Sequence, residues 1–96
     1  GFAPDPDKTA VFENGLDIKA LQLLADALCV RAGGIRGAFS GADGAFSFAI
    51  CGEETALGDF FAKFKAAFNT RGGGRNGIRQ GTVCAGRAEI ERLFTE

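Results

Sequence analysis

Arginines and glycines alternate near the C-terminal end of this 96-residue sequence, in a pattern that suits phosphate binding. Arg71, Arg75 and Arg79 are spaced four residues apart, and three consecutive glycines separate the first two. A guanidinium group presents planar pairs of N–H donors that match the oxygens of a phosphate. Glycine permits positive φ angles and leaves room for an anion to approach the main-chain N–H groups. The segment therefore predicts a loop that binds phosphodiester groups.

The charge distribution favours the same part of the chain. The net charge is only −1, but residues 1–59 carry four Lys/Arg and nine Asp/Glu, whereas residues 60–96 carry seven Lys/Arg and three Asp/Glu. No acidic residue occurs between Phe60 and Ala88. A local excess of basic residues indicates a nucleic-acid partner. The candidate nucleic-acid-binding residues are Lys63, Lys65, Arg71, Gly72, Gly73, Gly74, Arg75, Arg79 and Gln80.

Neither the glycine run nor Gln80 is specific for nucleic acid. A tight structural turn with solvated arginines is the alternative interpretation of the loop, and the amide of Gln80 can satisfy buried loop carbonyls as well as a ligand. The run is not a Walker loop, because no Gly-Lys-Ser/Thr follows it. It is not a dinucleotide-binding fingerprint either, because it follows a predicted helix instead of a strand.

Residues that would support catalysis or metal binding are scarce. The sequence has no His, so a Ser-His-Asp triad, a Cys-His pair or a His-ligated metal site cannot be formed within it. Cys29, Cys51 and Cys84 are widely spaced and odd in number, which predicts buried free thiols instead of a disulfide framework or a zinc site. Glu53 and Glu54 are adjacent but have no nucleophile or metal to pair with. We therefore expect no catalytic residue, metal or cofactor here, and any enzymatic activity would belong to a longer parent protein.

Apolar spacing and turn residues predict one domain over residues 9–96, after a linker or the end of a preceding domain at residues 1–8. Strands are expected at 9–13, 35–41, 45–51 and 80–85, with one helix from a cap at Asn14 to about Arg31 and others at 57–69 and 88–94. The predicted fold class is α/β, an α+β sandwich in which helices pack on a small mixed β-sheet in the order β-α-β-β-α-β-α. No secretory leader and no apolar run of membrane-spanning length is present, so we expect a cytoplasmic protein without a membrane partner.

Two local patterns indicate how the sheet is covered. From Ala45 to Cys51, large residues alternate with Ala, Ser and Cys, so one face of this strand is bulky and the other allows close packing. Asp43-Gly44, just before it, predicts a tight hairpin turn. Phe60, Phe64 and Phe68 are four residues apart and predict a helix whose aromatic stripe docks on the sheet.

The glycine-rich segment resembles the signature of the DHH-associated domain, which occurs in the C-terminal part of alanyl-tRNA synthetases, in AlaX-type alanyl-tRNA editing proteins and in DHH phosphoesterases. The triple glycine, the basic residue Arg75 and the Gln80-Gly81 pair match the synthetase-type signature, although Asn76 stands where proline is usual. The phosphoesterase branch usually has His at the position of Arg75. The resemblance therefore favours the alanyl-tRNA branch, and residues 86–94 are similar to AlaX-type C-termini.

The resemblance implies a non-catalytic accessory domain that contacts tRNA and supports formation of a homodimer. It also implies that activation, transfer and editing sites belong to other domains. Two alternatives stay open. In one, the chain is the substrate-binding half of a DHH-type phosphoesterase, with the metal-binding half upstream. In the other, it is a dimerisation module whose glycine loop only turns the chain.

Overall fold

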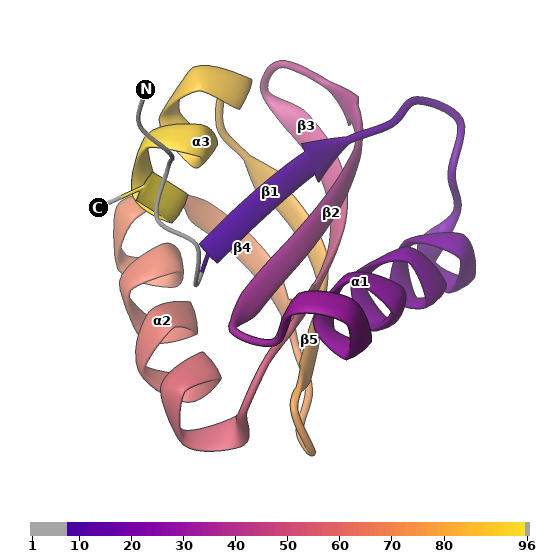
Figure 1. Cartoon of the computed structure of the whole chain (residues 1–96). Helices are drawn as coiled ribbons and strands as arrows, with labels where there is room; N and C mark the ends of the chain where they lie inside the picture. Colours follow the sequence, from indigo (N-terminus) through magenta and orange to yellow (C-terminus); the bar gives the residue numbers. More distant parts are fainter. Residues whose placement is uncertain (1–7, 96) are drawn as a thin grey trace, which may run out of the picture.

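The computed structural model describes residues 8–95, which form five strands and three helices (Figure 1). In chain order they are β1 (Lys8–Phe12), α1 (Ile18–Ala32), β2 (Ile35–Ala42), β3 (Ala45–Cys51), α2 (Glu54–Ala67), β4 (Asn69–Gly73), β5 (Ile78–Cys84) and α3 (Arg87–Thr95). Lys8 belongs to the first strand and not to the predicted linker, and the rest of that linker lies outside the described residues. None of the described helices is long and apolar enough to cross a bilayer.

The strands form a single mixed sheet in the order β1-β2-β3-β5-β4. Among the strands of residues 8–95, only β1 and β2 run parallel, and the other neighbouring pairs are antiparallel. This arrangement confirms the predicted α/β fold class. One strand was not predicted: β4 has the sequence NTRGG, in which Thr70 is the single β-branched residue, no residue is aromatic, and two of the five are glycines, which are rare in strands. It forms because β5 supplies the hydrogen-bonding partner, a contact that local propensity does not encode.

Helices cover both faces of the sheet, and the alternation along β3 decides which helix lies where. Phe46, Phe48 and Ile50 point to the face covered by α2 and α3, where most of the phenylalanines gather in one core. Ala49 points to the opposite face and packs with Leu21 and Ala25 of α1. Figure 1 shows α1 on one side of the sheet and α2 and α3 on the other. The predicted close packing against the small-residue face is therefore confirmed.

The ends of two helices differ from the predicted ones for a local reason. Asp17, not Asn14, caps α1, because its carboxylate accepts a hydrogen bond from the Ala20 N–H at 2.8 Å. α2 begins at Glu54, one turn earlier than expected, because the Glu53 carboxylate accepts from the N–H groups of Thr55 and Ala56. Glutamate is not among the preferred capping residues, so the sequence alone did not mark this position.

The cysteines are less buried than expected. Cys84 is exposed, and Cys29 and Cys51 are half-buried. The prediction of buried thiols is wrong for Cys84, because it lies at the end of β5, where its partner Asn69 in the edge strand β4 is itself exposed. All three are free thiols.

Candidate nucleic-acid interface

The glycine–arginine segment forms a β-hairpin made of β4, a turn at residues 74–77, and β5. Its turn projects from the end of the sheet that is lowest in Figure 1. Gly72 and Gly81 face each other across the two strands, with φ angles of 144° and 156°. A Cβ on Gly72 would overlap the carbonyl oxygen of Gln80, and a Cβ on Gly81 would overlap that of Arg71. The glycines thus allow the two backbones to approach each other closely, which is a structural role.

Gly73 differs from its neighbours, because a Cβ there would meet no atom within 4 Å. Gly74 resembles Gly72: its φ is 156°, and an added Cβ would overlap the carbonyl oxygen of Ile78. Of the three consecutive glycines, only Gly73 leaves free space beside the hairpin.

Arg79 is held inside the fold by a carboxylate. It is 8% exposed, and its guanidinium forms an ion pair with Glu54 at the start of α2, with an Nη2–Oε2 distance of 2.6 Å. The other carboxylate oxygen accepts from the Gly77 N–H at 2.7 Å. These contacts lower the pKa of Glu54 to about 2 and raise the pKa of Arg79. A backbone N–H of the loop and its third arginine therefore already bind an anion, and that anion is the chain's own glutamate.

The other two arginines of the segment remain open to solvent. Arg71 lies on the edge strand β4 and Arg75 lies in the turn, and both are exposed. Within residues 8–95, neither forms an ion pair with a carboxylate. Arg71 shares a face of the sheet with Gly73 and Gln80, because its register partner is Thr82 and side chains alternate along a strand.

The structure separates the two candidate lysines of α2. The Nζ of Lys65 lies 5.8 Å from the centre of the Phe61 ring, and the guanidinium carbon of Arg79 lies 5.9 Å from the same ring. Lys65 is therefore on the flank of α2 that faces the hairpin. Lys63 lies on the opposite flank, where it lines a hollow with Lys8 of β1, Ile35 of β2 and other residues of α2.

Gln80 is half-buried in β5, with Ala49 of β3 and Gly73 of β4 as its register neighbours. Its amide oxygen is fully buried, and no donor among the described residues reaches it. The predicted role as a partner for loop carbonyls concerns the amide nitrogen and stays a prediction.

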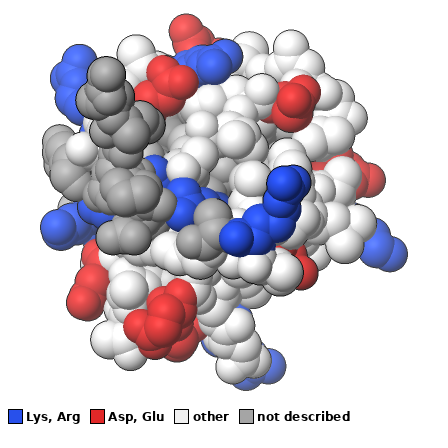
Figure 2. All heavy atoms as spheres, in the orientation of Figure 1, with Lys and Arg blue, Asp and Glu red and all other residues white. Residues whose placement is uncertain are grey.

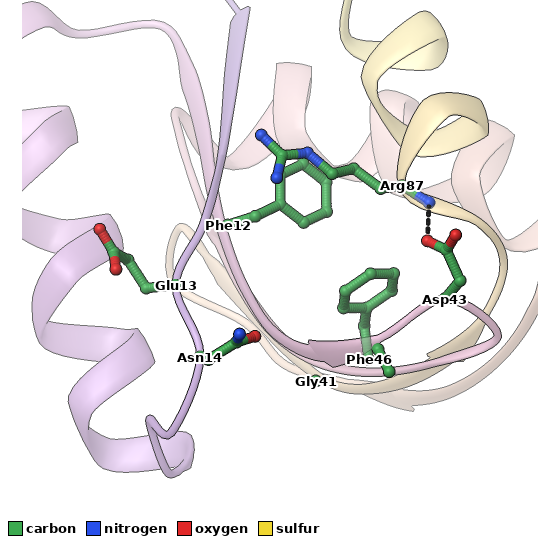
Figure 3. A pocket seen from close by; sticks show the side chains of 8 residues that line it. Phe12, Glu13, Asn14, Gly41, Asp43, Phe46 and Arg87 are labelled. Carbon is green, nitrogen blue, oxygen red and sulfur yellow. Dashed lines mark hydrogen bonds between the residues drawn. The ribbon is translucent and has the colours of Figure 1, made fainter.

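A pocket that the sequence did not indicate lies at the other end of the sheet (Figure 3). It has a volume of about 420 Å³ and is lined by residues from β1, the β2–β3 turn and α3. The Arg87 guanidinium lies 4.6 Å from the Phe12 ring centre, and the Arg87 backbone N–H donates to Asp43. Because Glu13 and Asp43 line this pocket together with Arg87, it has no excess of positive charge. It is therefore not part of the phosphate-binding hypothesis.

The face that carries β1 shows no large area of a single charge. Figure 2 shows Lys and Arg interspersed with Asp and Glu across this face. Within residues 8–95, no three His, Cys, Asp or Glu side chains are grouped closely enough to hold a metal ion. Of the candidate basic residues, Lys65, Arg71 and Arg75 lie near the hairpin, are exposed and form no ion pair with a carboxylate within residues 8–95.

Comparison with known proteins gives a match at the level of structure. The C-Ala domain from Aquifex aeolicus alanyl-tRNA synthetase is similar to this chain, with a TM-score of 0.65 and 19% sequence identity, and the likeness covers 94% of each chain. The two share a fold. No protein-family model matches the sequence, and no curated protein matches it either. The specific resemblance to DHH-associated and AlaX-type domains stays a prediction.

Proposed function

We propose that this chain is a non-catalytic accessory domain that binds the phosphate backbone of RNA, with tRNA as its partner. The binding surface is the β4 stripe, which we define as Lys65, Arg71 and Arg75. The observation that carries the proposal is the presence of these exposed cations, without ion-pairing carboxylates, around the edge strand β4. Lys65 lies on its α2 side, Arg71 on the sheet face that α1 covers, and Arg75 in the turn. Arg79 and the glycines build the hairpin that presents the stripe, and Lys63 lies outside it.

The course of the chain aligns these cations along the edge. α2 ends at Ala67 and β4 begins at Asn69, so helix and strand meet at one end. At the other end, Glu54 at the start of α2 binds Gly77 in the turn after β4. Lys65 is therefore near the start of β4 and Arg75 is beyond its end, with Arg71 between them. The eleven-residue separation of Glu54 and Lys65 gives the stripe a length of about 16 Å, which is enough for several phosphates of one strand.

Two arguments support tRNA in particular. The similar structure is a domain of an alanyl-tRNA synthetase, and the glycine-rich segment resembles the signature found in proteins that act on alanyl-tRNA. Phosphate contacts position a nucleic acid without reading its sequence. With about three such contacts, binding should be weak, on the order of micromolar or weaker at physiological salt.

A charge-reversal experiment tests the proposal. Arg71→Glu/Arg75→Glu should abolish binding to a fluorescently labelled tRNA transcript, measured by polarisation at low salt. The matched control is Lys19→Glu/Arg31→Glu, which makes the same charge change on the exposed surface of α1. The control should retain binding close to that of the unaltered chain. Equal loss in both double variants, or no binding by the unaltered chain at low salt, would refute the proposal.

A second candidate function, self-association, is favoured by one observation on α1. Leu23 is 66% exposed and Val30 is 78% exposed on the side of α1 away from the sheet, seven residues apart and flanked by Lys19 and Asp26 of opposite charge. An antiparallel pair of α1 helices from two copies would bring these charges together. Light scattering tests this: a dimer that Leu23→Glu converts to a monomer supports it, and a monomer at all concentrations excludes it.

A further inference from the structure

Two of the three cysteines lie together at one end of α1. Cys29 is in the last turn of α1, and Cys51 is the last residue of β3. The Cys29 Sγ lies 3.7 Å from the carbonyl oxygen of Gly34, two residues before Arg36, and Arg36 is the register partner of Cys51. The neighbouring Cys51 thiol also contributes to a raised pKa of Cys29. We propose that Cys29 and Cys51 form a dithiol site that low-molecular-weight disulfides, such as oxidised glutathione, convert into an internal disulfide bond.

The packing of α1 on the sheet places the two sulfurs. Cys51 belongs to the small-residue face of β3 and packs with the cluster formed by Leu21, Ala25 and Ala49. Cys29 follows Ala25 by one helical turn, so it lies over the same face. Both side chains are half-buried, so a small reagent can reach the pair while the surrounding helix and strand hold it in place.

Arg36 supplies a positive charge beside the pair. It is the register partner of Cys51 in β2, and its Nε donates to the carbonyl oxygen of Gly33 at 2.6 Å. Burial and the Cys51 thiol raise the pKa of Cys29 to about 12, and Arg36 offsets only part of this effect. The raised pKa disfavours the thiolate of Cys29, and a thiolate is the reactive form of a thiol, so we assign the first nucleophilic attack to Cys51.

The reaction balances with oxidised glutathione as the only oxidant. The Cys51 thiolate attacks one sulfur of the glutathione disulfide, whose S–S bond breaks and releases one glutathione thiolate. Cys29 then loses its proton to solvent and attacks the Cys51 sulfur, which releases the second glutathione. Two protein thiols are oxidised and one glutathione disulfide is reduced to two glutathione molecules.

The bond would join α1 to the strand end that supports the hairpin. The residue after Cys51 is Gly52, whose N–H donates to the Gly77 carbonyl oxygen in the β4–β5 turn. The link closes a segment that contains β2, so it restricts the unfolded chain. We expect the thermal midpoint of unfolding to rise by on the order of 10 °C.

Cys84 provides an internal control for the experiment. It is exposed and near the opposite end of the sheet from Cys51, so it can only form a mixed disulfide with glutathione. After oxidation and mass spectrometry without reductant, the unaltered chain should carry one glutathione and one internal disulfide. The Cys84→Ser chain should carry no glutathione, lose the mass of two hydrogens and show no free thiol after unfolding. Phenylarsine oxide, which bridges close thiols, should bind the reduced Cys84→Ser chain in a ratio of one to one.

Variants that keep only one of the two thiols separate the first attack, assigned to Cys51, from closure of the disulfide by Cys29. Cys29→Ser/Cys84→Ser and Cys51→Ser/Cys84→Ser should each acquire one glutathione and no internal disulfide. The variant that keeps Cys51 should react faster, because burial still disfavours the thiolate of Cys29. Circular dichroism checks that each variant is folded. The proposal is overturned if the Cys84→Ser chain acquires two glutathiones, or if both its thiols stay free under conditions that modify Cys84 in the unaltered chain. Neither the number of bound glutathiones nor the number of free thiols depends on RNA binding.

Discussion

Removing two charges of the β4 stripe should flatten the salt dependence of RNA binding. Each neutralised phosphate contributes about 0.7 to 0.9 to the slope of log K against log salt, because binding releases condensed counterions. With Lys65, Arg71 and Arg75 engaged, raising salt from about 50 to about 200 mM should weaken binding by about 20- to 40-fold. Arg71→Gln/Arg75→Gln leaves only Lys65, so the same change should weaken binding by only about 3-fold.

The assay is a polarisation titration of labelled tRNA at four or more salt concentrations, repeated for the double variant and for Lys19→Gln/Arg31→Gln. The α1 control removes the same number of charges from a surface outside the stripe, so its slope should equal that of the unaltered chain. The slope, unlike the affinity at one salt concentration, reports how many phosphates are contacted. A double variant with an unchanged slope would refute the assignment of these arginines to phosphate contacts, even if its affinity fell.

Three further predictions concern the framework that presents the stripe. Because the pKa of Glu54 is lowered to about 2 from its ordinary value of 4.5, its ionised form stabilises the fold above about pH 4.5, and this contribution is lost as the pH falls toward 2. The difference in urea stability between the unaltered chain and Glu54→Gln should therefore shrink over that range. Gly81→Ala should destabilise the fold by about 1–3 kcal/mol or more in the same urea assay, because its φ of 156° is unfavourable for alanine and the added Cβ would overlap the Arg71 carbonyl. Phe64→Ala should cost about 3–5 kcal/mol in thermal or chemical unfolding, because Phe64 is fully buried and contacts four or more rings of the core; a loss below about 1 kcal/mol would show that this core is not the main source of stability.

Side-chain periodicity was sufficient to predict most of the architecture. Strand β3 matches its predicted bounds, because bulky and small residues alternate along it and Asp43-Gly44 supplies the preceding turn. The aromatic spacing in α2 correctly identified its buried face. These features depend on a residue and its near neighbours in sequence, which is why a single sequence contains them.

The candidate site was predicted only in part from the sequence. Composition and charge were enough to locate a basic, glycine-rich segment, and the resemblance to alanyl-tRNA proteins pointed to a fold that the structural comparison bears out. The sequence could not show that Arg79 pairs with Glu54, 25 positions away, or that Lys63 and Lys65 lie on opposite flanks of one helix. It also could not distinguish glycines that accommodate a ligand from glycines that accommodate a neighbouring strand.

What the sequence by itself determined was seven of the eight elements, their buried faces and the local excess of positive charge, because these follow from the period of apolar residues and from counting charges. Only the tertiary structure decided which cations stay exposed, since that depends on whether a carboxylate from a distant helix reaches them. It likewise decided that β4 is a strand, because β5 supplies its hydrogen-bonding partner. Each of these outcomes is a contact between segments far apart in the chain, and the free energy that fixes it belongs to both segments together.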